Sequence, residues 1–139
     1  MGMKILVDTN VILDVLLDRQ PFSGPASRLF ALIEKSAVEA FVCATTVTTV
    51  DYLLNQSLSR ADSKKALLRL LELFEIAPVN RPVIEEALQS RMTDFEDAVL
   101  AHAANLVGVA AVVTRNIKDF KFSPIKALDP IEILSIIEE

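Results

Sequence analysis

Cysteine and long apolar runs are what this sequence lacks most clearly. It has a single cysteine, Cys43, inside an apolar segment, so no disulfide can form within the chain and the thiol is expected to be buried. No apolar run approaches the roughly 20 residues that cross a bilayer. The first residues lead directly into a predicted strand, without the features of a signal peptide. We therefore expect a cytoplasmic protein that does not span a membrane.

Positive charge is also scarce. The chain has 14 lysine and arginine residues against 19 aspartates and glutamates, and its formal net charge of −5 argues against indiscriminate binding to phosphates. One basic group, over residues 60–69, is interpreted as the solvated face of a helix. A second group follows the last strong strand, at Arg115, Lys118, Lys121 and Lys126. It fits either a polar loop or a basic rim beside a binding site.

The alternation of element types along the chain predicts the fold class. With 139 residues, 52% of them hydrophobic, the chain is long enough for one compact domain over residues 1–139. Short apolar strands alternate with amphipathic helices, which favours a three-layer α/β/α fold with a central parallel sheet of four or five strands. The strands are predicted at residues 5–7, 38–44, 75–79, 109–114 and, as a short fifth strand, 125–128. The first and fourth strands are expected to be neighbours.

The first strand ends in polar residues, which marks a candidate site. Residues 5–7 have the pattern of a strand buried on both faces, and Asp8, Thr9 and Asn10 follow directly. Thr9 or Asn10 is predicted to cap the helix that comes next. Ligands of open α/β sheets bind outside the carboxyl ends of the strands. Asp8 is therefore either a helix cap or a carboxylate of a binding site.

Two further polar clusters are expected to lie near Asp8. The stretch Thr93-Asp-Phe-Glu96 has the pattern of a capping box, so a helix is predicted from about Asp94 onward. Asp94 and Asp97 are three residues apart and share one helix face. Asn116 and Asp119 follow the fourth strand. If the first and fourth strands pair, these groups converge, and carboxylates that lie so close repel one another unless protons or a cation neutralise them.

The donor atoms of these clusters point to a hard divalent cation. Oxygen ligands without a set of histidines and cysteines favour Mg²⁺ or Mn²⁺, which leave room for substrate phosphates. Such an ion lowers the pKa of a bound water and neutralises charge on a phosphodiester during in-line attack. Asp94 and Asp97 also suit the first turn of a helix, where they interact favourably with its dipole. His102, five residues after Asp97 and off the shared face, is interpreted as structural.

Three stretches together resemble the signatures of a known family. They are Val7-Asp-Thr-Asn-Val-Ile-Leu-Asp14, Asp94-Phe-Glu-Asp-Ala98 and Val113-Thr-Arg-Asn-Ile-Lys-Asp-Phe120. In order and spacing they are similar to the signature stretches of PIN domains (PilT N-terminal domains), in particular of the toxin-like ribonucleases (VapC-like), over essentially the whole chain. The resemblance implies a Mg²⁺- or Mn²⁺-dependent endoribonuclease that hydrolyses RNA phosphodiester bonds with metal-activated water. It also implies a possible toxin of a toxin–antitoxin pair.

The resemblance implies roles for individual residues. Asp8 matches the first acidic ligand and Asp97 the acid before an alanine-rich helix, while Asn116 and Asp119 both fall at the last acidic position. The predicted catalytic residues are Asp8, Asp94 and Asp97, and the predicted metal ligands are these three with Asn116 or Asp119. The predicted substrate-binding residues are Thr9, Asn10, Thr114, Arg115, Lys118 and Lys121. The implied partners are RNA, an antitoxin protein and a second copy of the chain in a homodimer.

One departure from the family pattern leaves alternatives open. The family commonly has a glutamate in a Thr-x-x-Glu context after the second strand, whereas Thr46-Val-Thr-Thr49 places Thr49 at that position and Asp51 two residues further on. Asp94 substitutes for the missing acid, or the metal binds more weakly, or the protein is a catalytically inactive binding module for nucleic acid or protein. A phosphatase that uses Asp8 as nucleophile is a third reading, but Asn10 stands where such enzymes have a second aspartate.

Overall fold

Five short apolar segments form a parallel sheet in the computed structural model, which describes residues 2–138. The strands are β1 (Lys4–Val7), β2 (Glu39–Cys43), β3 (Glu75–Ala77), β4 (Ala111–Val113) and β5 (Ala127–Leu128). Their order is β3-β2-β1-β4-β5, and every neighbouring pair is parallel. The predicted pairing of the first and fourth strands is therefore confirmed. Strand β3, which precedes Pro78, lies at an edge of the sheet, as its proline indicated.

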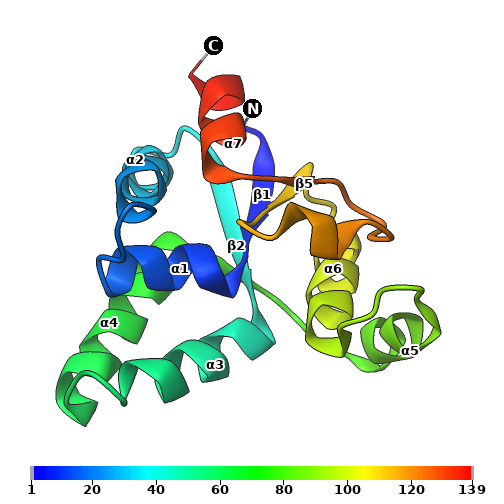
Figure 1. Ribbon diagram of the computed structural model, residues 1–139, viewed down its shortest axis with the longest axis horizontal. Coiled ribbons are helices and arrows are strands. Elements are labelled where there is room, and N and C mark those ends of the chain that lie inside the picture. Colours follow the sequence, from blue (N-terminus) through cyan, green and yellow to red (C-terminus); the bar gives the residue numbers. More distant parts are fainter. Residues whose placement is uncertain (1, 139) are drawn as a thin grey trace.

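Helices cover both faces of the sheet and make the predicted three-layer α/β/α fold (Figure 1). The first layer contains α1 (Thr9–Leu16), α2 (Ser23–Glu34), α3 (Ala44–Leu54), α4 (Arg60–Leu73) and α7 (Pro130–Ile137). The second contains α5 (Arg81–Gln89) and α6 (Phe95–Val107), with the 3-10 helix η1 (Ile117–Phe120) beside α6. Among residues 2–138, no helix is both long and apolar enough to cross a membrane.

The central strand β1 shows why its sequence is an unbroken apolar run. Ile5 and Val7 pack into the core under the first helical layer, while Leu6 packs into the core under α5 and α6. All three side chains have 0% exposure. A strand that is covered on both faces has no position for a polar residue until it ends. The first polar side chain of the segment, Asp8, therefore marks the carboxyl edge of the sheet.

The caps of two helices differ from those predicted. Helix α1 begins one residue earlier than expected, because Asp8 rather than Thr9 or Asn10 is its N-cap and the Asp8 Oδ1 atom accepts from the Thr9 backbone N–H at 2.7 Å. Aspartate caps helices as well as asparagine does and better than threonine. The choice of Thr9 or Asn10 was wrong for this reason.

Helix α6 repeats the same correction. The predicted capping box of Thr93 and Glu96 is wrong, since Asp94 is the N-cap and its Oδ1 atom accepts from the Asp97 backbone N–H at 2.9 Å. The helix begins one residue later than a Thr93 cap requires. The shift leaves the carboxylate of Glu96 free of a capping role, which matters for the site described below.

Helix α6 ends at Val107, and its C-cap residue, Gly108, allows a test of the fold. Gly108 has a left-handed backbone conformation, φ +73°, which costs a residue with a Cβ atom about 1–2 kcal/mol. No atom lies within 4 Å of the Cβ position. We therefore expect Gly108→Ala to lower the free energy of unfolding by about 1 kcal/mol through backbone strain alone. Urea denaturation measures this change.

Gly24 in α2 is the matched control, because it also has open space at its Cβ position but an ordinary φ. Gly24→Ala should leave stability unchanged or raise it by up to about 1 kcal/mol, since alanine restricts the unfolded chain. Equal effects of the two substitutions would contradict the left-handed end of α6.

Candidate active site

Asp8 is a buried carboxylate held from two sides. Its Oδ1 atom caps α1, and its Oδ2 atom accepts from the Thr114 hydroxyl at 2.8 Å. The side chain has 6% exposure. Burial raises the pKa of Asp8 above its ordinary value, and the negative charges of Glu96 and Asp119 raise it further, against the lowering effect of the hydrogen bonds. The two interpretations of Asp8 are thus compatible, because only one of its oxygens acts as the cap.

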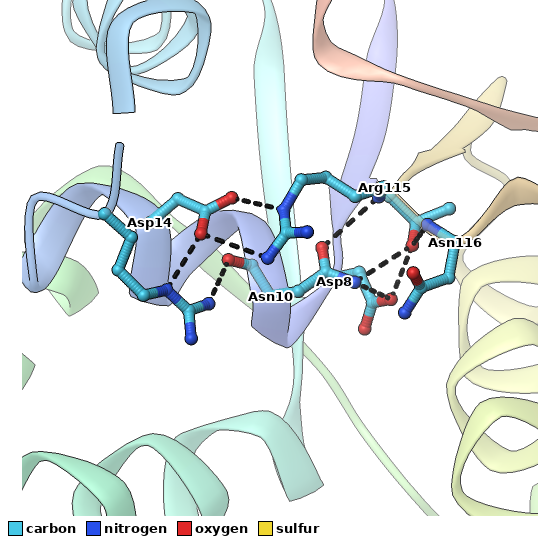
Figure 2. A network of polar contacts seen from close by, with 7 residues as sticks. Asp8, Asn10, Asp14, Arg115 and Asn116 are labelled. Atoms are coloured by element: carbon cyan, nitrogen blue, oxygen red, sulfur yellow. Dashed lines mark hydrogen bonds and ion pairs between the residues drawn. The ribbon is translucent and has the colours of Figure 1, made fainter. Parts of the chain in front are cut away.

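The turns after β1 and β4 are joined by side chains that the sequence singled out (Figure 2). The Asn10 Nδ2 atom donates to the Asp8 carboxylate at 3.4 Å and lies 3.3 Å from the Thr114 hydroxyl. The Asn10 Oδ1 atom accepts from the Arg115 backbone N–H at 3.3 Å, and the Asn116 N–H donates to the Thr114 hydroxyl at 3.0 Å. Asn10 and Thr114 therefore hold the Asp8 carboxylate, and the backbone after β4 holds these two side chains in turn.

Asp97, in α6, is affected by the charges of the other acids of the candidate site. It is half-buried in the first turn of α6. Burial raises the pKa of Asp97 to about 7, together with the negative charges of Asp8, Asp94, Asp119 and Glu96, in that order. A carboxylate feels such charges strongly only over short distances. Acids from three separate segments thus influence the protonation of Asp97, while their role as one metal site stays a prediction.

The two candidates for the last acidic position differ in this respect. Asp119, in η1, raises the pKa of both Asp8 and Asp97. Asn116 is uncharged, is exposed, and meets the site through its backbone N–H. The electrostatics of the two buried acids favour Asp119 over Asn116 at this position, and its role as a ligand stays a prediction.

Glu96 is a member of the site that sequence reasoning missed. Its negative charge raises the pKa of both Asp8 and Asp97. The capping-box interpretation had assigned this carboxylate to the Thr93 backbone N–H, but Asp94 is the N-cap of α6 and Glu96 has no capping role. Its place in the same first turn as Asp97 is the signal that could have found it.

A buried ion-pair network beside the site was also missed. Asp14, fully buried on α1, accepts from Arg115 Nε at 2.6 Å and from Arg19 Nε at 2.9 Å. The Arg19 guanidinium also donates to the Asn10 carbonyl at 3.0 Å (Figure 2). Removing one partner from a buried pair costs about 3–5 kcal/mol, because the other charge stays buried. Arg115 is therefore tied to the fold, and its RNA-binding role stays a prediction.

The remaining predicted residues lie around the acids. Lys118 and Lys121 are exposed in and after η1. The Thr9 hydroxyl donates to the Thr46 hydroxyl at 3.0 Å, which links α1 to the start of α3. Thr49, where the family commonly has glutamate, is half-buried and donates to the Thr45 carbonyl within its own helix at 3.1 Å. Thr49 is neutral, and its hydroxyl is engaged within α3.

The acidic side chains of this site are candidate ligands for a divalent cation. Within residues 2–138, no group of three or more His, Cys, Asp or Glu side chains is gathered closely enough to hold a metal ion. The acids nevertheless act on one another, and the pKa of Asp97 near 7 shows that a neutralising charge would be favourable. Carboxylate oxygens are the donors that Mg²⁺ and Mn²⁺ prefer. The chemistry of the donors fits such an ion.

Comparisons with known proteins agree with this architecture. The fold is a parallel sheet between two helical layers, with Asp8 at the carboxyl end of β1 and further acids in the neighbouring α6 and η1 segments. The chain matches the model of the PIN domain over residues 4–118, and it belongs to the PIN domain family. No curated protein matches the chain.

Solved structures of toxin–antitoxin systems have a similar fold. A toxin–antitoxin complex from Klebsiella pneumoniae matches with 23% identity and a TM-score of 0.68, over 91% of this chain and 97% of that one. DNA-bound VapBC from Salmonella typhimurium matches with 19% identity and a TM-score of 0.70, over 92% and 98%. VapC20 from Mycobacterium tuberculosis, a sarcin-ricin loop cleaving toxin, matches with 20% identity and a TM-score of 0.63, over 78% and 86%. The predicted PIN domain family is confirmed, and its toxin-like (VapC-like) branch stays a prediction.

The electrostatics of Asp97 predict how stability depends on pH. Its folded-state pKa of about 7 lies above the ordinary value of 3.8, so between these values the folded protein holds a proton that the unfolded chain has lost. The contribution of Asp97 to the free energy of unfolding is therefore complete at low pH and decreases as the pH rises through this interval. We expect Asp97→Asn to match the wild type near pH 4 and to be the more stable protein above about pH 7.

Urea denaturation across this pH range measures the difference between the two proteins. Glu72→Gln, on an exposed position of α4, removes one negative charge away from the cluster and serves as the control. Parallel stability curves for wild type and Asp97→Asn would contradict the raised pKa of Asp97.

Proposed function

We propose that this PIN domain is a Mg²⁺- or Mn²⁺-dependent endoribonuclease of the toxin type. The observation that supports the proposal is the state of Asp97, because burial and the negative charges of Asp8, Asp94, Asp119 and Glu96 raise the pKa of this carboxyl to about 7. A fold tolerates such mutual repulsion where function needs it. The likeness to VapC20, a cleaving toxin with the same fold, supports this choice of activity.

The residues of the chain divide the work of the proposed reaction. Asp8, Asp97 and Asp119 are the proposed ligands and would have to draw closer together around the ion. Asp94 and Glu96 would add negative charge at the start of α6. A bound Mg²⁺ or Mn²⁺ supplies an activated water and neutralises charge on the phosphodiester. Asn10 and Thr114 keep Asp8 in one orientation, because both approach its Oδ2 atom. This rigidity limits the reorganisation that the site needs during the reaction.

Substrate contact is assigned to the exposed cations beside the acids. Lys118 and Lys121 lie in and directly after η1, close in sequence to Asp119. Lysine at such a position attracts the RNA backbone through its charge and carries no sequence information. Thr9 and Asn10 belong to the same edge, and we retain them as candidate contacts to the substrate.

The assembly of the protein is proposed from its relatives. The similar structure from Klebsiella pneumoniae is a toxin–antitoxin complex, and the one from Salmonella typhimurium is VapBC bound to DNA. We propose an antitoxin protein as a partner of this chain on that basis. A homodimer and a cytoplasmic location, both expected from the sequence, stay predictions.

A specific observation favours a second candidate function. Thr49 carries no charge where the family commonly places glutamate, and its hydroxyl is engaged with the Thr45 carbonyl. A site with one fewer ligand binds a cation less tightly. The alternative is a PIN domain that binds RNA or protein without cleaving it.

Cleavage of mixed RNA in the presence of Mg²⁺ or Mn²⁺ tests the proposed activity. We expect Asp97→Asn to reduce the cleavage rate by about 100-fold or more, the scale of loss that misplaced reacting groups cause. The folded structure should persist, because no hydrogen bond of the Asp97 side chain is needed to cap α6. Glu72→Gln should retain full activity, and a chelator should abolish it. Absence of cleavage by the wild type with either ion would favour the binding module.

Thr49→Glu tests the significance of the departure from the family pattern. The substitution adds a carboxylate in the middle of α3, so the affinity for Mn²⁺ should increase if this position faces the acids. Titration calorimetry of the folded protein measures the affinity without any need for cleavage. Thr48→Glu, on an exposed neighbouring position, is the control. Equal affinities in all three proteins would show that the α3 position is separate from the site.

A further inference from the structure

One aromatic ring, that of Phe122, is in contact with two cations in segments that adjoin the acidic residues. The Arg91 guanidinium lies over the Phe122 ring, 4.1 Å from its centroid, and the Lys121 ammonium lies 5.3 Å from the same centroid. Phe122 has 41% exposure, whereas Phe120, two residues earlier, is buried at 5%. The turn is thus anchored by one phenylalanine and displays the other beside positive charge.

The position of this cluster relates it to the acids. Arg91 comes three residues before Asp94, and Phe122 comes three residues after Asp119. The contact therefore joins the two segments that deliver acidic side chains to the site, and η1 packs beside α6 (Figure 1). Among residues 2–138, neither Arg91 nor Lys121 forms an ion pair with a carboxylate. Their positive charge is available to an external anion.

We propose that Phe122 and Arg91 form a stacking platform for an unpaired RNA base next to the bond that is cleaved. Bases of single-stranded RNA stack on aromatic rings and on guanidinium planes, and lysine holds the adjoining phosphate. In a chain with net charge −5, an exposed aromatic ring flanked by two unpaired cations suits a polyanion that carries flat bases. The inference rests on the proposed ribonuclease function and names its substrate as single-stranded RNA.

The second cation–π contact of the described chain provides a control. Arg115 lies 3.8 Å from the centroid of the Phe22 ring, and Phe22 has 40% exposure, nearly the same as Phe122. The Arg115 guanidinium, however, is bound to buried Asp14. Phe22→Leu therefore removes an equally exposed ring from a cation whose charge is already neutralised.

Binding of short fluorescein-labelled RNAs, followed by anisotropy in the presence of a chelator, tests the platform without cleavage. The two probes are an oligoadenylate and an abasic ribose-phosphate strand of equal length. Wild type should prefer the oligoadenylate, and Phe122→Leu should weaken its binding by about tenfold while binding of the abasic strand is unchanged. Phe122→Trp should keep the preference, and Phe22→Leu should behave as wild type.

Further measurements distinguish the loss of the ring from the loss of a positive charge and from a failure to fold. The salt dependence of binding should be unchanged in Phe122→Leu and flatter in Arg91→Gln, because only the latter removes a cation. If Phe122→Leu fails to fold, Phe122→Trp and Arg91→Gln carry the test. An unchanged preference in Phe122→Leu would overturn the platform and leave the ribonuclease proposal standing. RNA binding without metal-dependent cleavage would overturn the ribonuclease alone, and no RNA binding by the wild type would overturn both.

Discussion

The parallel pairing of β1 with β4 is the constraint on which the candidate site depends. The register places Val7 opposite Val113, so the next residues, Asp8 and Thr114, emerge together at the carboxyl edge of the sheet. The 2.8 Å hydrogen bond between their side chains follows from this register. A shift by one residue would turn every side chain of β1 to the opposite face. The two hydrophobic cores, which divide Leu6 from its neighbours, make that shift unfavourable and thereby position the acid.

Electrostatic cost and structural support are balanced at this edge. Asp8 and Asp97 both have raised pKa values, chiefly because they are buried and also because other carboxylates lie near them. Asp8 is held in place by hydrogen bonds from the Thr9 backbone N–H and the Thr114 hydroxyl, which favour its charged form. The buried pairing of Asp14 with Arg115 fixes the β4 turn to α1 from behind the site. Stability is thus supplied next to the acids rather than by them, which is a common arrangement at functional sites.

The layers, the strand order at the centre and the approximate place of the site could be predicted from local patterns, because two-sided burial leaves an unbroken apolar run such as that of β1. The exact caps could not, since Thr93 and Asp94 are both good caps and only the three-dimensional hydrogen bond to Asp97 decides between them. The Asp14 network was invisible for a different reason. It joins residues 101 positions apart, and one sequence contains no signal that pairs them.

The missing glutamate of α3 has to be weighed against the charge that is present. The pKa of Asp97 is about 7 without an acid at position 49, because burial and the negative charges of four other carboxylates raise it. Glu96 is one of them, so the site does not lack negative charge. With Thr49 in α3, the site has no carboxylate from the layer on the β2 side of β1, whereas Glu96 adds a negative charge from the opposite helical layer. A divalent ion depends on the placement of its ligands as well as on their charge. The departure from the family pattern therefore changes the placement of ligands in the proposed site, and weaker binding of a cation is the expected consequence.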